Sequence, residues 1–263
     1  MIKISLFIIS ITPRSFFILL VDIYMYTRIY KLFASYKITK VNLKIAYPNL
    51  NNSNIELISK LSIRESLISG YETIYSWARH TNDSNSFIFR VENNFLLKNY
   101  ARQQKGLITV AIHNRSADML LAWICSQTPT VSLYKKIKNK SLDSFVKNKR
   151  ESGGSVCVET SISGVRKIYK ALKQNKVICF AADQVPQRGM GEYIKFFNRD
   201  SYSTTLVQSL ALKTKSPLVF LYINSNKDNY LTITIESINN AIYKDSKHSQ
   251  IINNGIEKII NKR

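Results

Sequence analysis

The chain has 263 residues, of which 45% are hydrophobic, so it is long enough to bury a core and too apolar to be disordered. Its 38 Lys and Arg against 17 Asp and Glu give a formal net charge of +21. This excess of positive charge favours binding to a nucleic acid, an anionic membrane surface, an acidic protein or phosphate groups. A compositional bias toward Lys, Asn, Ile and Tyr on solvated faces is the alternative explanation for part of it.

The N-terminal segment MIKISLFIISITPRSFFILLVDIYMY is strongly apolar but is interrupted by Pro13, Arg14 and Asp22. It therefore lacks the ~18 uncharged residues that make a secure spanning helix. We expect an apolar membrane-anchoring helix over residues 1–26, and a single main domain over residues 27–263. Basic residues after the segment favour the cytoplasmic side of a membrane and anionic headgroups. A buried helix of a soluble protein and a secretory signal are the alternatives, and no small-residue cleavage site supports the second.

Beyond the N-terminal segment, helical and strand-like patterns follow one another along the chain. Ser53 and Glu56 form a capping box that predicts the start of a helix. Strands are predicted at 87–91, 107–112, 131–134, 156–158, 177–181, 218–223 and 230–235. Helices are predicted at 93–104, 116–127, 141–151, 162–175 and 203–214. This alternation indicates an α/β fold with a largely parallel central sheet flanked by helices, and the last two strands form a hairpin.

Polar residues gather where two of the predicted strands end. His113 follows the strand at 107–112, and Asp183 ends the apolar run VICFAAD. In open parallel sheets, sites lie at the carboxyl ends of the strands. Ser116 is expected to cap the next helix, and Asp118 to lie in its first turn, where the helix dipole favours a carboxylate. His113 and Asp118 face each other only if the turn bends the chain between them; a strand-end histidine beside a capping acid is the alternative, purely structural interpretation.

The three cysteines, Cys125, Cys157 and Cys179, are far apart in the sequence and lie in apolar runs. None has a histidine or a second cysteine at metal-ligand spacing. We therefore interpret them as buried thiols in a reducing compartment and expect no bound metal. Because no glycine-rich phosphate-binding loop is present, we expect no nucleotide cofactor.

With His113-x-x-x-x-Asp118 at a strand end, the chain resembles the lipid A biosynthesis late acyltransferases, which are lauroyl and myristoyl transferases. These enzymes share an H-x4-D/E motif with the glycerolipid acyltransferases. Further similar blocks follow in the family's order from about residue 20 to about residue 225: VNLKIAYPNL, LYKKIKNKSLDSFVKNKR, GVRKIYKALKQNKVICFAADQVPQ and EYIKFFNRDSYSTT. Lys195 and Asn198 replace the Pro and Gly of the family's Phe-Phe block, which leaves a glycerolipid or glycolipid acceptor as an alternative.

The resemblance implies lipopolysaccharide biosynthesis at the cytoplasmic face of the bacterial inner membrane, with residues 27–263 as the acyltransferase domain. A fatty acyl chain would pass from acyl carrier protein or coenzyme A to a hydroxyl of a phosphorylated saccharolipid, the lipid A precursor. His113 would be the general base, and Asp118 would accept its other ring N–H. The resemblance places Asp183 beside Arg150, which would bind a phosphate or the thioester carbonyl. The other expected substrate-binding residues are Arg115, Lys135 and Gln184.

Two further classes remain open on the sequence. A non-catalytic, basic membrane-surface protein would keep the fold without the chemistry. A nucleic-acid-binding protein would use the positive charge, but the charge is spread over the chain and no nucleic-acid-binding motif is visible. We therefore expect a membrane, a thioester donor and a lipid acceptor as partners, and no nucleic acid.

Overall fold

The computed structural model describes residues 2–238, 240–244 and 248–262. The chain divides into two compact units, Met1–Arg79 and His80–Arg263. In the first unit, four helical segments pack around or beside the long helix α4 (Asn52–Ala78). They are α1 (Ile2–Ile11), α2 (Arg14–Thr27), η1 (Ile29–Leu32) and α3 (Ala34–Ala46). The core of this unit consists of Val21, Met25, Tyr30, Tyr36, Ile63 and Ile68.

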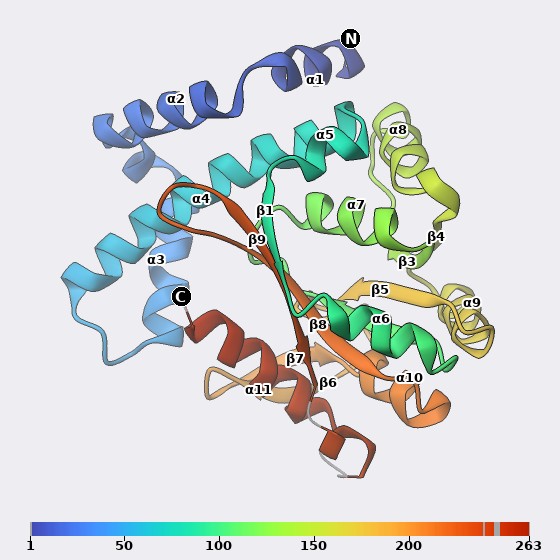
Figure 1. Ribbon diagram of the computed structural model, residues 1–263. Helices are drawn as coiled ribbons and strands as arrows, with labels where there is room; N and C mark the ends of the chain where they lie inside the picture. Colours follow the sequence, from blue (N-terminus) through green and yellow to red (C-terminus); the bar gives the residue numbers. More distant parts are fainter. Residues whose placement is uncertain (1, 239, 245–247, 263) are drawn as a thin grey trace. The chain divides into compact units, whose positions relative to one another are not determined.

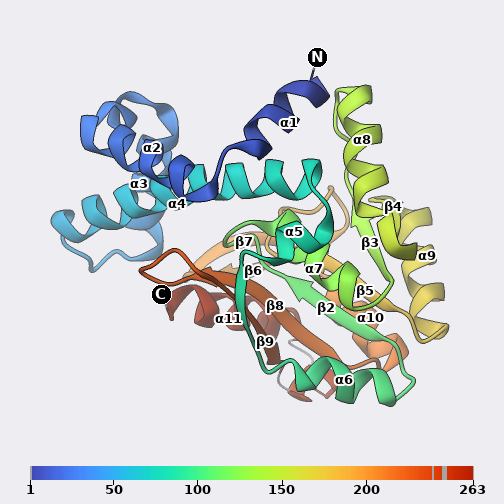
Figure 2. The ribbon, with the colours of Figure 1, turned by 45° about the horizontal axis from the view of Figure 1, so that its top comes forward.

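The N-terminal segment forms two helices where a single one was expected. Pro13 has no amide hydrogen to donate, so α1 ends at Ile11 and α2 begins at Arg14, directly after the proline. Figure 2 shows the resulting bend between α1 and α2. Arg28, in the left-handed conformation with φ 62°, ends α2. Among the helices of the described ranges, none is both long enough and apolar enough to cross a membrane.

The cap of α4 also differs from the expected capping box. Asn51 occupies the N-cap position, and its side chain accepts a hydrogen bond from the Asn54 amide at 2.8 Å. Asn caps a helix as well as Ser does, so the helix begins before Ser53, which lies inside it. Glu56 does not close a box but forms ion pairs with lysines of η1 and α3.

The second unit contains a seven-stranded sheet in the order β1-β9-β8-β2-β5-β3-β4. Its strands are β1 (Ile88–Glu92), β2 (Leu107–Ala111), β3 (Thr130–Tyr134), β4 (Val156–Glu159), β5 (Val177–Ala181), β8 (Leu218–Ser225) and β9 (Leu231–Ser237). The strands from β8 to β4 are parallel to one another, while β8 and β9 form the predicted antiparallel hairpin. The predicted α/β class with a mostly parallel central sheet is therefore confirmed (Figure 1).

Helices cover both faces of this sheet. They are α5 (Thr81–Asn85), α6 (Phe95–Arg102), α7 (Ala117–Gln127), α8 (Lys140–Arg150), η2 (Ser152–Gly154), α9 (Ile162–Lys173), α10 (Leu206–Thr214), η3 (Asn240–Tyr243) and α11 (His248–Asn261). Apolar residues of α9, α10 and α11 pack on one face, and those of α6 and α7 on the other. Along β2, Ile108 and Val110 belong to the first of these cores and Leu107 to the second, because successive strand residues point to opposite faces.

Besides the short segments α5, η2 and η3, two features of the second unit were not predicted. One is the hairpin of β6 (Gly191–Phe196) and β7 (Arg199–Thr204), which forms a separate two-stranded sheet. Its turn residues Phe197 and Asn198 both have positive φ, 47° and 57°, as a two-residue hairpin turn requires. Since β7 runs to Thr204, the helix predicted at 203–214 begins only at Leu206. The other unpredicted element is α11.

Candidate active site

His113 and Asp183 come together because their strands are neighbours in the sheet. Ala111 at the end of β2 pairs with Ala181 at the end of β5, so the residues two positions further on leave the sheet side by side. The His113 Nδ1 atom lies 2.8 Å from Asp183 Oδ1, and the His113 backbone N–H donates to Asp183 Oδ2 at 2.6 Å. One carboxylate therefore holds both the ring and the backbone of the histidine.

This pairing differs from the contacts that were expected for the two acids. Asp118 was expected to hold the His113 ring and Asp183 to hold Arg150, and the structure has the opposite arrangement. Asp118, in the first turn of α7, accepts from Arg150 of α8, with Nε at 2.8 Å and Nη2 at 2.5 Å from its Oδ1. Adjacent parallel strands bring Asp183 to the ring, whereas Asp118 extends from a helix that packs beside α8.

Asp183, Asp118 and Arg150 nevertheless all influence the pKa of His113. The hydrogen bond with Asp183 raises the pKa of His113 above its usual value, and burial opposes this rise. The negative charges of Asp183 and Asp118 raise the pKa further, while the positive charge of Arg150 lowers it. Asp118 thus acts on His113 through its charge, without a hydrogen bond to the ring.

The second ring nitrogen of His113 is the one available for chemistry. When Nδ1–H donates to Asp183, the neutral ring has its lone pair on Nε2. The side chain is 40% exposed, and its Nε2 has only the Gln184 side-chain amide as a described neighbour, at 3.3 Å. The ring is therefore partly open to solvent.

Arg150 is held in place from two sides. Besides its ion pair with Asp118, its guanidinium lies 5.3 Å from the centre of the Tyr134 ring. The Tyr134 hydroxyl in turn donates to Asp143, and burial raises the pKa of this hydroxyl above its usual range. Asn139 caps α8 by accepting from the Leu142 amide at 3.0 Å. The H-x4-D motif and the segment LYKKIKNKSLDSFVKNKR are thus brought together at Arg150.

The remaining predicted residues lie in different surroundings. Arg115 was expected to contact phosphate, but it is only 3% exposed and donates from Nη1 to Ser225 Oγ at 2.6 Å. It joins the turn after β2 to the end of β8. Ser116 is at the N-cap position of α7 as predicted, but in the left-handed conformation and without a side-chain capping bond. Lys135 is exposed directly after β3.

The cysteines form no disulfide within the described ranges. Cys157 and Cys179 are buried as predicted, whereas Cys125 is partly exposed. Burial raises the pKa of the Cys179 thiol to about 12, which keeps it protonated. The part of the chain that the structure describes contains no group of three or more His, Cys, Asp or Glu arranged to hold a metal ion.

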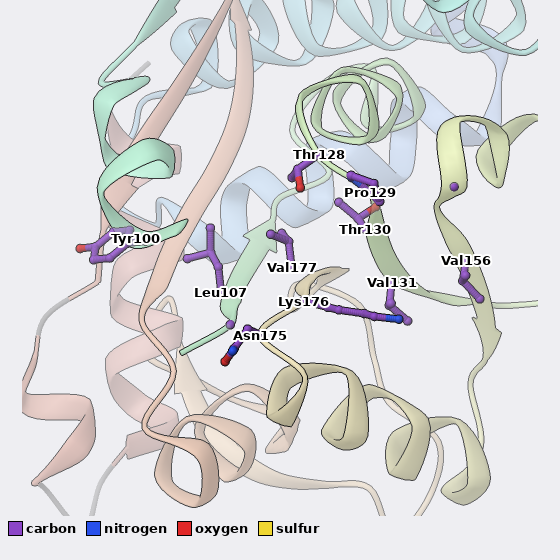
Figure 3. Close-up of a pocket in the computed structure, with 12 residues that line it drawn as sticks. Tyr100, Leu107, Thr128, Pro129, Thr130, Val131, Val156, Asn175, Lys176 and Val177 are labelled. Carbon is purple, nitrogen blue, oxygen red and sulfur yellow. The ribbon is translucent and has the colours of Figure 1, made fainter. Parts of the chain in front are cut away.

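Two hollows lie near the sheet, at opposite edges. The larger, of about 310 Å³, is lined by the first residues of β2, β3, β4 and β5 and by Lys176 (Figure 3). It contains no histidine or acid among its lining residues. The smaller, of about 40 Å³, includes Asp183 and Gln184 at the carboxyl edge. We place the candidate site at the carboxyl edge, because the acid-base groups meet there and the larger hollow offers none.

Besides the exchanged partners of Asp118 and Asp183, two contacts of the site were not foreseen from the sequence. They are the Gln184 amide beside His113 Nε2 and the Tyr134 ring beside Arg150. The sequence did contain a signal for the first contact. Gln184 directly follows Asp183 at the end of one predicted strand, and His113 follows the end of another. For the contact between Tyr134 and Arg150, the sequence shows only that Tyr134 ends a predicted strand directly before a basic segment.

Comparison with known proteins agrees with this geometry. No curated protein sequence matches the chain. The family model described as bacterial lipid A biosynthesis acyltransferase matches residues 1–263. The family match over all 263 residues leads to one conclusion: the chain is an acyltransferase and belongs to the bacterial lipid A biosynthesis acyltransferase family.

Proposed function

We propose that His113 is the general base of an O-acyl transfer from a thioester to a hydroxyl of a lipid A precursor. The observation that carries this proposal is the orientation of the ring, with Nδ1 bound to Asp183 and the side chain 40% exposed to solvent. A neutral alcohol is a poor nucleophile and needs a base to take its proton. Asp183 fixes the ring and stabilises the imidazolium that forms, as the acid does in a Ser-His-Asp triad.

The reaction then proceeds in two proton transfers. His113 Nε2 takes the hydroxyl proton while the alcohol oxygen attacks the thioester carbonyl, giving a tetrahedral oxyanion. Collapse of this intermediate breaks the carbon–sulfur bond, and the leaving thiolate takes the proton back from Nε2. The acceptor itself supplies the nucleophilic hydroxyl, so no enzyme serine is needed. The ester, the free thiol and the neutral histidine are the products.

Arg150 supplies the positive charge of the proposed site. Its pair with Asp118 fixes the guanidinium near His113, where it would bind a phosphate of the acceptor or the thioester carbonyl oxygen. Asp118 is thus proposed as a positioning residue, although the H-x4-D motif suggested contact with the ring. Gln184 would guide the acceptor hydroxyl to Nε2, and the exposed Lys135 would contact phosphate. Arg115, being buried, would stabilise the turn that carries His113.

The donor is proposed to be acyl carrier protein or coenzyme A, and the place of reaction the cytoplasmic leaflet of the bacterial inner membrane. The net charge of +21 supports this, because an acidic carrier, phosphorylated lipids and anionic headgroups all attract a basic protein. The exposed apolar side chains of the N-terminal helices support membrane attachment of residues 1–26.

The test compares His113→Ala with His80→Ala, a change at an exposed histidine outside the site. With an acyl-thioester donor and lipid A precursor, His113→Ala should lower the initial rate by on the order of 10²–10⁴, whereas His80→Ala should leave it unchanged. Mass spectrometry of lipids from cells lacking the gene should show a lipid A species lighter by one acyl chain. A lighter glycerolipid or glycolipid would instead identify the alternative acceptor, and near wild-type turnover by His113→Ala would exclude the mechanism.

A further inference from the structure

The outer side of α2 presents a row of large apolar side chains with no charged residue among them. Their positions recur every three or four residues, which places them along one side of the helix. They are between 45% and 88% exposed: Phe16, Leu19, Leu20, Ile23 and Tyr26. Half-exposed apolar residues continue on α1: Phe7, Ile8 and Ile11. Exposed apolar side chains gathered in this way mark a contact with a partner or a membrane.

The inner side of α2 packs against α4 of the same unit. Both charged residues of α2 turn toward α4: Arg14 donates to Glu72 at 2.6 Å, and Asp22 accepts from Arg64 at 2.6 Å. The Glu72 side chain is completely buried, and a buried carboxylate is stable only with its partner in place. The ion pairs therefore fix which side of α2 faces outward.

Positive charge follows this apolar row in the sequence. Arg28 ends α2, and Lys37 and Lys44 lie exposed on α3. Within the described ranges, none of these three has an acidic partner, in contrast to Lys31 and Lys40, which bind Glu56. Unpaired cations next to an apolar surface suit the anionic headgroups and the acyl chains of a bilayer.

We propose that α1 and α2 lie in the plane of an anionic lipid surface, with the outer row inserted into one leaflet and the inner side of α2 kept on α4. A spanning helix would contact lipid on all sides, whereas α2 has a single uncovered side. The inference rests on the membrane location in the proposed function and specifies how the chain attaches. Its readouts are lipid contact and depth, so they are independent of whether acyl transfer occurs.

Depth measurements on the full chain test the orientation. Four variants are prepared, and in each of them one residue is changed to Cys and labelled with a nitroxide. The labelled positions are Phe16, Leu19, Ile23 and Tyr26. The background carries Cys125→Ser, since the other two cysteines are buried. Vesicles contain phosphatidylcholine with roughly a quarter of phosphatidylglycerol as the anionic lipid. An in-plane helix gives all four labels the same shallow depth, to within about 5 Å, whereas a spanning helix changes depth by ~1.5 Å per residue, about 15 Å over this range. Such a gradient would overturn the proposal.

Vesicle binding tests the surface itself. Ile23→Asp should lower partitioning by on the order of tenfold to a hundredfold, because it removes a buried aliphatic side chain from the lipid. Gln174→Glu, which adds the same charge at an exposed site of the second unit, is the control and should bind like the wild type. Equal binding by both variants, labels that stay in water, or a lipid-free dimer that covers the row would each refute a lipid-facing surface. Ile23 is 54% exposed, so unchanged circular dichroism should confirm that the variant folds.

Discussion

Replacing Asp183 by Asn should slow acyl transfer far more than the same change at Asp118. The carboxylate of Asp183 binds His113 Nδ1 at 2.8 Å, while Asp118 binds Arg150. The amide introduced by Asp183→Asn has similar size but no charge, so it cannot stabilise the imidazolium. Its NH₂ group can also donate to Nδ1, which would put the ring proton on Nε2, where the base must be free.

The expected magnitude follows from these two losses. A hydrogen bond to a charged group contributes about 1.5–3 kcal/mol, which corresponds to a rate factor of about 10–10². The wrong tautomer lowers the rate further. The equivalent change in a Ser-His-Asp triad lowers kcat by a factor of about 10⁴. We therefore expect a loss on the order of 10³–10⁴ for Asp183→Asn. For Asp118→Asn we expect a rate about tenfold lower than that of the wild type, because one positioning contact of Arg150 is weakened.

The assay measures initial rates with acyl carrier protein as donor for the wild type, both single variants, His113→Ala and the double variant His113→Ala/Asp183→Asn. If His113 and Asp183 act as one unit, the double variant should be scarcely slower than His113→Ala. Thermal unfolding of each protein separates loss of chemistry from loss of fold, since Asp183 also binds the His113 backbone. The reasoning fails if Asp118→Asn costs as much as His113→Ala while Asp183→Asn keeps near wild-type turnover.

Four further outcomes are expected. Arg150→Ala should weaken transfer about tenfold to a hundredfold by removing the charge that binds phosphate or carbonyl oxygen, whereas Lys147→Ala on the same helix should have no effect; equal effects would make Arg150 an ordinary surface residue. Gln184→Leu should raise KM for the acceptor and largely keep kcat, and a kcat loss alone would contradict a guiding role. Because Asp183 raises the pKa of His113, kcat/KM should fall on acidification with an apparent pKa above the ordinary ~6.5. The same shift contributes stability that is fully present below about pH 6.5 and is lost as pH rises through the folded pKa, which urea titration measures.

The main sheet could be predicted from the sequence because its strands are short, apolar and alternate with helical patterns. The hairpin β6–β7 could not, since its turn uses Phe197 and Asn198 at positive φ, and Phe gives no signal for that conformation. The break between α1 and α2 was visible as Pro13, but the sequence alone did not show that the inner side of α2 rests on a second helix.

His113 and Asp183, the two residues of the proposed acid-base pair, were both identified from the sequence as polar residues at the ends of apolar strands. Their pairing was not found, because it depends on strand order. Along the chain β5 comes after β3 and β4, yet in the sheet it lies between β2 and β3. No local pattern near His113 or Asp183 reveals that β5 inserts next to β2. Asp118 was chosen as the partner of His113 because it lies only five residues away in the sequence. Proximity in the sequence was a poor guide to contact in space.

The bond between His113 and Asp183 joins residues 70 positions apart, and this separation has a consequence during synthesis of the protein. A growing chain that has made β2 but not β5 holds the histidine without its carboxylate. Even a completed chain lacks the pair until β5 inserts between β2 and β3, which is a non-local step and therefore a slow one in folding. Under the proposed mechanism, a partly folded molecule has no oriented base with which to cleave thioesters by reaction with water, and catalytic competence becomes a property of the finished sheet.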